Sequence, residues 1–213
     1  MMDGNDNRYV QYGCGWTAPE GWRNFDSSPT LRFERLPIIG KMYTKNPARF
    51  PENVEYGDIV KGLPVPASST EAIYCSHVLE HLSLEDFRKA LKNTHRLLRS
   101  GGVFRFVLPD LEYSIKKYVA STSDDAAPNF LKETLLGQET RPRGLKGLMF
   151  LWLGNASHLW MWDYKAIVHE LEETGFRNIR RASYGDSTNS VFKQVEVKGR
   201  WDNCLGVECT SSS

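Results

Sequence analysis

The feature that most constrains the fold is a pair of apolar runs separated by one amphipathic helix. The runs "EAIYCS" (71–76) and "VFRFVL" (103–108) are nearly continuous in apolar residues, which is typical of strands buried on both faces. Between them, Ser83 with Asp86 three residues on indicates a capping box, and a helical apolar pattern follows as far as Gly101-Gly102. One strand–helix–strand crossover predicts a parallel sheet.

The rest of the chain continues this alternation. Short β-prone segments lie at 8–13 and 22–26, helices are expected at about 110–120 and 163–175, and two closing strands at 176–185 and 203–210. The pattern predicts an α/β fold. Residues 121–157 break the alternation with Pro, Gly, Arg and aromatic residues, so we interpret them as a lid or substrate-binding insertion over the carboxyl edge of the sheet.

Length and composition limit the class of protein. A chain of 213 residues with 40% hydrophobic content is expected to form one domain, 1–213, and a net charge of +1 without charged blocks argues against a nucleic-acid binder. Four cysteines without a CxxC pair fit buried thiols in a reducing compartment. The first residues lack signal-peptide features, and the most apolar stretch, 144–156, contains Lys146 and is too short to span a bilayer. We therefore expect a cytoplasmic protein without a membrane partner.

Ligand chemistry in such a sheet is expected at the carboxyl ends of the strands. Gly13 and Gly15 follow the first strand, where glycine lets backbone approach a ligand, and Asp26 ends the second, where a carboxylate can accept both hydroxyls of a ribose. Asp58, in the stretch "YGDIVKGLPVP" (56–66), is expected near the end of a third strand. A tight turn with a surface aspartate explains the Gly and Asp residues equally well, because GxG alone is a weak signal.

The stretch "HVLEHL" (77–82) allows several interpretations. His77 and His81 have the i, i+4 spacing of a metal-binding helix face, but the sequence offers no third ligand cluster nearby and no HExxH order, so no metal site is predicted. Glu80 and His81 are assigned to helix capping and core packing. His77, at the end of the expected strand 71–76, is either a catalytic group or a hydrogen-bonded, semi-buried histidine.

Residues near the insertion also have two interpretations each. His158 precedes a helix that Asp163 caps, so it is either a hydrogen-bonded imidazole in a hydrophobic staple or a base facing the acceptor pocket. Asp110 is interpreted as a helix cap. The basic residues 141, 143 and 146 suit either an anionic acceptor or a solvated loop.

The order of these segments resembles the class I S-adenosylmethionine-dependent methyltransferases, in particular the small, single-domain, methyltransferase-11-like group. The resembling pieces are "YGCG", "GWRNFD", "GDIVKGLP", "IYCSHVLEHL", "LLRSGGVFRFVLPD", "HLWMWDYKAIVHELEETGF" and "LGVECT". The resemblance implies a Rossmann-like, seven-stranded mixed sheet with helices on both faces and a reversed final strand. It implies S-adenosylmethionine as cofactor, with contacts from Tyr12, Gly13, Cys14, Gly15, Asp26, Ser27, Asp58, Ile59, Ser76 and His77.

One segment departs from the family pattern. Many members have a helix before the acidic strand, but residues 16–25 include Pro19 and Gly21 and cannot form a helix of normal length. The expected activity is methyl transfer to a small molecule, with an oxygen of a sugar or secondary metabolite as acceptor and His77 or His158 as catalytic base. A non-catalytic binding or assembly module is the alternative. A nicotinamide enzyme is disfavoured because "WTAPEG" (16–21) does not complete GxGxxG.

Overall fold

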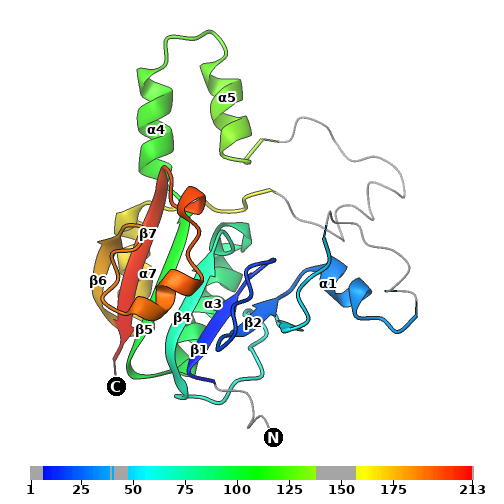
Figure 1. Cartoon of the computed structure of the whole chain (residues 1–213). Helices are drawn as coiled ribbons and strands as arrows, with labels where there is room; N and C mark the ends of the chain where they lie inside the picture. The colour runs from blue at the N-terminus through cyan, green and yellow to red at the C-terminus, as the bar shows by residue number, and fades with distance from the viewer. Residues whose placement is uncertain (1–6, 39, 41–47, 138–156, 213) are drawn as a thin grey trace, which may run out of the picture.

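A central β-sheet organises the chain (Figure 1). The structure is a computed structural model that describes residues 7–38, 40, 48–137 and 157–212. The seven strands of the sheet have the order β3-β2-β1-β4-β5-β7-β6. All neighbours are parallel except β7, which runs antiparallel to β5 and β6. The mixed sheet with a reversed final strand is thereby confirmed. The strands are β1 Tyr9–Tyr12, β2 Arg23–Asp26, β3 Val54–Tyr56, β4 Thr70–Ser76, β5 Leu98–Pro109, β6 Phe176–Ala182 and β7 Cys204–Ser211.

Local capping explains where the main helices begin. The Ser83 hydroxyl accepts a hydrogen bond from Asp86 N (3.2 Å) at the start of α3, and the Asp110 and Asp163 carboxylates cap α4 and α7 in the same way. Gly175 ends α7 in the left-handed conformation, with φ 107°. The described helices are α1 Pro29–Glu34, α3 Leu84–Leu97, α4 Leu111–Ala120, α5 Ala126–Glu133 and α7 Tyr164–Thr174, with 3₁₀ turns η1 Leu79–His81, η2 Ser190–Gln194 and η3 Lys198–Arg200.

The predicted end of α3 was wrong. The helix ends at Leu97 rather than at the Gly101-Gly102 pair, and β5 begins at Leu98, which pairs with Thr70 of β4. The register of these two strands then shifts between Thr70 and Ala72. Two glycines lie at this irregularity, Gly101 and Gly102. Gly101 has φ +71°, and a Cβ added at Gly102 would lie 2.9 Å from Thr70 O. The two glycines thus serve strand pairing rather than helix termination.

Alternating side chains of the central strands build two cores. Phe104 and Phe106 of β5 point toward α3 and α7, whereas Val107 packs on the opposite face with Phe192 and Trp201. In Figure 1, α3 and α7 lie behind the sheet and the turns η2 and η3 lie in front of it. One face is therefore covered by long helices and the other by the connection between β6 and β7.

Arg105, in the middle of β5, is a fully buried cation on the second face. Its guanidinium contacts three carboxylates, those of Glu196 (2.6 Å), Glu208 (2.9 Å) and Asp186 (3.0 Å), and lies 4.6 Å from the centroid of the Trp201 ring. The partners come from β7 and from the connection after β6. The network fastens this connection, which includes η2 and η3, onto the sheet.

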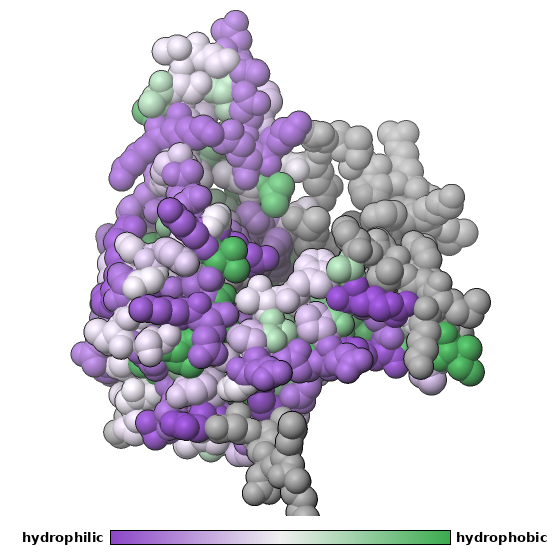
Figure 2. Space-filling model, in the orientation of Figure 1, coloured by the Kyte–Doolittle hydropathy of each residue, from purple (hydrophilic) through white to green (hydrophobic). Residues whose placement is uncertain are grey.

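Residues 121–157 are only partly described, because 138–156 lie outside the described residues. The described part contains α5, a helix that the sequence pattern did not predict, and α5 pairs with α4 through a Lys117–Glu133 ion pair (2.7 Å) and a Tyr118–Phe130 ring contact. The two helices project beyond the carboxyl edge of the sheet (Figure 1), and their surface in Figure 2 is mostly hydrophilic. Residues 141, 143 and 146 and the apolar stretch 144–156 lie in the part that is not described. A lid role stays a prediction.

Two further expectations concern cysteines and membranes. Cys14, Cys75 and Cys209 are free and buried as expected, whereas Cys204 is only half-buried because it lies at the start of β7. Among the described residues, no helix is long and apolar enough to cross a bilayer.

Candidate functional site

The carboxyl ends of β1, β2 and β4 lie side by side, because Tyr12 pairs with both Phe25 and Cys75. The loop after β1 therefore faces the end of β2 on one side and the end of β4 on the other. As the sequence predicted, this loop contains no helix over residues 13–22. The conformation of this loop must therefore be stabilised by contacts other than helical hydrogen bonds.

Two buried amide side chains hold the loop in place. Gln11 donates to the Thr17 carbonyl (2.6 Å) and to Asn24, while Asn24 donates to the carbonyls of Pro19 (3.2 Å) and Trp22 (3.0 Å). Because buried backbone carbonyls require donors, these amides replace the hydrogen bonds that a helix would supply. The loop is short but structurally defined.

Asp26 connects the loop to the end of β2. Its carboxylate accepts the backbone N–H of Gly15 (3.0 Å) and that of Ser28 (2.7 Å). Gly15 has φ +54°, and no described atom lies within 4 Å of where its Cβ would be, so the surface beside its Cα is open. At Gly13, with φ +64°, an added Cβ would collide with the Val78 side chain. Backbone exposed beside a carboxylate at adjacent strand ends suits a ligand that carries a ribose.

The other predicted cofactor residues differ in whether their side chains are buried or exposed. The Tyr12 side chain is buried and its hydroxyl contacts Thr94 Oγ1 (3.2 Å), so only the Tyr12 backbone borders the loop. The Ile59 side chain belongs to the core, whereas Asp58 is half-buried and accepts Val60 N (3.0 Å). Ser27 is exposed at the end of β2. Burial raises the pKa of Cys14 to about 12, which makes this residue a neutral thiol.

Ser76 and His77 meet a segment that the sequence pattern did not associate with the site. Arg200 of η3 donates to the Ser76 carbonyl (3.1 Å) and hydroxyl (3.3 Å), and the Arg200 carbonyl accepts from His77 Nε2 (2.9 Å). A small hollow lies between this segment and the Gly13 loop, with Tyr74 in its wall. No local signal in the sequence indicates this approach, because η3 follows β6 by a long irregular connection.

His77 is held on both ring nitrogens. Besides the Arg200 contact, Nδ1 lies 3.2 Å from Glu80 Oε1, and Nε2 lies 3.8 Å from Cys204 Sγ. Burial alone would lower the pKa of His77, but contacts with Cys204, Glu80 and the Arg200 carbonyl together raise it well above its ordinary value. A protonated and doubly engaged imidazole favours the interpretation of His77 as a fixed part of the pocket wall.

The structure brings His158 to the other two residues of the "HVLEHL" stretch. One ligand atom from each of Glu80, His81 and His158 lies within 4.8 Å of the others. Backbone hydrogen bonds make this approach possible, since Leu159 N (2.8 Å) and Trp160 N (3.2 Å) both donate to the Glu80 carbonyl. Glu80 lies in the separate turn η1 rather than in α3, so its predicted role in capping that helix is not observed.

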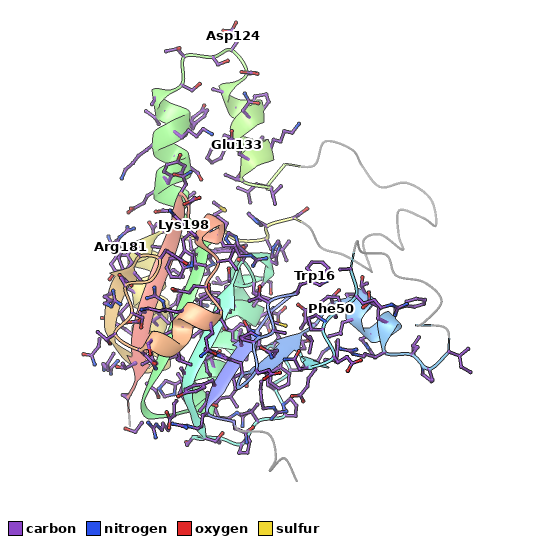
Figure 3. The ribbon with its side chains drawn as sticks, viewed as in Figure 1. Trp16, Phe50, Asp124, Glu133, Arg181 and Lys198 are labelled. Atoms are coloured by element: carbon purple, nitrogen blue, oxygen red, sulfur yellow. The ribbon has the colours of Figure 1, made fainter. Side chains whose placement is uncertain are left out.

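Two aromatic rings border the open side of the Gly15 loop. Trp16 stacks on Phe50 with ring centroids 5.3 Å apart, and its Nε1 donates to the Ala48 carbonyl (3.1 Å). Both rings lie beside the strand ends in Figure 3, well away from the tip of the α4–α5 projection. A second hollow between α4 and α5 lies outside the region where the strand ends converge.

Comparison with known proteins supports the resemblance. Residues 37–106, about a third of the chain, match the family model described as a methyltransferase domain. A search of curated proteins gives no significant match. Among solved structures, the complex between the Haloferax volcanii Trm112 methyltransferase activator and a methyltransferase is similar over 100% of this chain and 86% of that chain, with 12% identity and a TM-score of 0.51.

A methyltransferase from Thermotoga maritima, described as S-adenosylmethionine-dependent, is similar over 98% of this chain and 84% of that chain, with 14% identity and a TM-score of 0.51. At these identities the likeness concerns the fold. The chain therefore resembles the class I S-adenosylmethionine-dependent methyltransferases both in fold and, over residues 37–106, in sequence, and this resemblance implies S-adenosylmethionine as its cofactor.

Proposed function

We propose that the chain transfers a methyl group from S-adenosylmethionine to an oxygen of a small molecule, such as a sugar or a secondary metabolite. The observation that carries the proposal is the open Gly15 backbone beside the Asp26 carboxylate, with the histidine-rich end of β4 next to it. One side of the carboxyl edge thus suits the cofactor and the other side suits the acceptor.

On the cofactor side, Asp26 is the group that would accept the ribose hydroxyls. Asp58 would lie near the adenine, and the backbone of residues 12–15 would lie along the methionine part. Bound cofactor supplies a methyl group already activated by its sulfonium, so the residues around it need to align the acceptor and exclude water rather than create a reactive group.

On the acceptor side, a hydroxyl must lose a proton when it gains the methyl group. His77 is poorly suited to accept this proton, since both of its nitrogens are already engaged and its pKa is raised. We assign the handling of the proton to the neighbouring cluster of Glu80, His81 and His158. The His81 side chain is 31% exposed, so the cluster has access to solvent and to a ligand.

Calorimetry with S-adenosylmethionine and S-adenosylhomocysteine tests the cofactor side. Losing hydrogen bonds to a charged acceptor costs about 1.5–3 kcal/mol, so we expect Asp26→Ala to weaken binding by about 10- to 150-fold. Asp26→Asn replaces one carboxylate oxygen with an NH₂ donor, so it can keep only one of the contacts with Gly15 N and Ser28 N, and its affinity should lie between those of Asp26→Ala and the unaltered chain.

Asp124→Ala is the matched control, because it removes a carboxylate at the tip of the α4–α5 projection (Figure 3). It should leave the affinity unchanged. Equal affinity of Asp26→Ala and the unaltered chain would remove Asp26 from the cofactor site. Absence of binding at millimolar cofactor would favour the alternative of a non-catalytic binding or assembly module.

A further inference from the structure

The residues Glu80, His81 and His158 form a cluster of electron-pair donors with no cation among them. We propose that this cluster binds one divalent transition-metal ion, with Zn²⁺ as the representative case. This is not the His77–His81 pair considered from the sequence, because His77 is not in the cluster; the ligand that the sequence did not place near His81 is His158, which reaches the cluster from the segment before α7.

Burial without hydrogen bonds is the first support. The Glu80 side chain is 1% exposed and His158 is 9% exposed. Among the described residues, both Glu80 carboxylate oxygens and His158 Nδ1 are buried and have no hydrogen-bond partner. The His77 ring forms an ion pair with Glu80 Oε1 (3.2 Å) and so offsets part of the Glu80 charge, but Glu80 Oε2 and His158 Nδ1 have no hydrogen-bond partner among the described residues. Since unpaired buried polar groups cost free energy, a cation that binds all three side chains would relieve this cost.

The orientation of His81 is the second support. Its Nδ1 contacts the Ser157 carbonyl (3.1 Å), and because a carbonyl can only accept, Nδ1 carries the proton. In the neutral ring, Nε2 then carries the lone pair, and it lies 4.0 Å from Glu80 Oε1. A zinc ion bonds to nitrogen and to carboxylate oxygen at about 2 Å each, which places tetrahedral ligand atoms about 3.3 Å apart. The two acceptors would therefore have to approach each other by a fraction of an ångström when an ion binds. A backbone carbonyl that fixes the tautomer of a histidine ligand is a usual feature of metal sites.

The donor set indicates the class of metal. Two imidazoles and one carboxylate suit zinc and neighbouring divalent transition metals, whereas Mg²⁺ prefers oxygen ligands only. Three protein ligands leave a position open for water or a substrate oxygen. Under the proposed function, an ion here would lower the pKa of an acceptor hydroxyl, and His158 would serve as a ligand rather than as a free base. Metal binding itself does not depend on that function.

The test is calorimetric titration of Zn²⁺ into the full chain after treatment with a chelator. We expect one ion per chain, much weaker binding of Mg²⁺, and visible d–d absorption of a tetrahedral or five-coordinate ion when Co²⁺ is used. His158→Gln should lower Zn²⁺ affinity by at least about 10- to 100-fold, with circular dichroism showing that it is folded. His169→Gln removes an exposed histidine of α7 and should leave the affinity unchanged.

Cys204→Ser tests the competing position, because Cys204 and His77 lie 3.8 Å apart and a thiolate is a good zinc ligand. If Cys204→Ser abolishes binding while His158→Gln retains it, the ion lies at the other pair and the proposal is wrong. Absence of saturable Zn²⁺ binding by the folded chain would also overturn it. The same sample titrated with S-adenosylmethionine reports on the proposed function separately, so the two failures are distinguishable.

Discussion

Replacing Arg105 by methionine should destabilise the chain strongly. The Arg105 side chain is fully buried and donates to Glu196, Asp186, Glu208 and the Ser183 carbonyl (2.7 Å). Methionine preserves much of the apolar length of arginine, so the change tests the charge and hydrogen bonds more than the packing.

The magnitude follows from what remains after the substitution. Glu196, whose side chain is 1% exposed, keeps the Gly185 N–H (3.0 Å) but loses its cation, and the Ser183 carbonyl loses its donor. Removing one partner of a buried ion pair costs about 3–5 kcal/mol, because the other charge stays buried. This is a large share of a total stability of about 5–15 kcal/mol.

Urea unfolding followed by tryptophan fluorescence measures this cost, and Trp201 beside the guanidinium is a local reporter. Arg180→Met is the control, since Arg180 contacts the same Asp186 and Glu208 but its side chain is 40% exposed, and we expect it to cost about 0–1 kcal/mol. Adding Glu196→Gln to Arg105→Met should recover part of the loss. If the two arginine variants cost the same, the network is screened by solvent and our reasoning about its burial is wrong.

Two further predictions concern the histidines and acid stability. In an assay of methyl transfer at saturating cofactor, His158→Ala should lower turnover by about 10²-fold or more, while His77→Ala should retain most of the turnover. If His77→Ala loses turnover and His158→Ala retains it, His77 is the catalytic group. Although burial alone would raise the pKa of Asp186, its hydrogen bonds to Arg180, Ser183 N and Arg105 lower it from 3.8 to about 2. The resulting stabilisation is fully present above about pH 4 and is lost as the pH falls toward 2. Asp186→Asn should therefore reduce the change in unfolding free energy across this pH window. We expect a reduction of less than about 1 kcal/mol, because the side chain is a third exposed. An unchanged profile would contradict this assignment.

Sequence patterns predicted the elements whose causes are local. Ser83, Asp110, Asp163 and Gly175 act within one turn of the helix that each delimits, so their roles were readable from spacing. The convergence of the Gly15 loop and Asp26 followed from topology, because parallel strands end at one edge.

Contacts between distant segments could not be predicted in this way. His158 reaches Glu80 because two backbone N–H groups after it donate to the Glu80 carbonyl, and backbone hydrogen bonds leave no residue signature. Arg105 lies within an apolar run of the sequence, and its acidic partners lie beyond residue 180, so sequence spacing did not connect them. The end of α3 was misplaced because pairing of Leu98 with Thr70 overrode the local glycine signal.

The position of β7 has a consequence for how the protein matures during its synthesis. Because β7 lies between β5 and β6 but follows both in the sequence, β6 has no partner strand until Cys204–Ser211 has left the ribosome. Until then β5 presents an open edge with Arg105 lacking Glu208, and an unpaired edge of this kind is prone to wrong association. Completion of the sheet is thus a late and non-local step, which favours slow folding and a need for protection of the nascent chain.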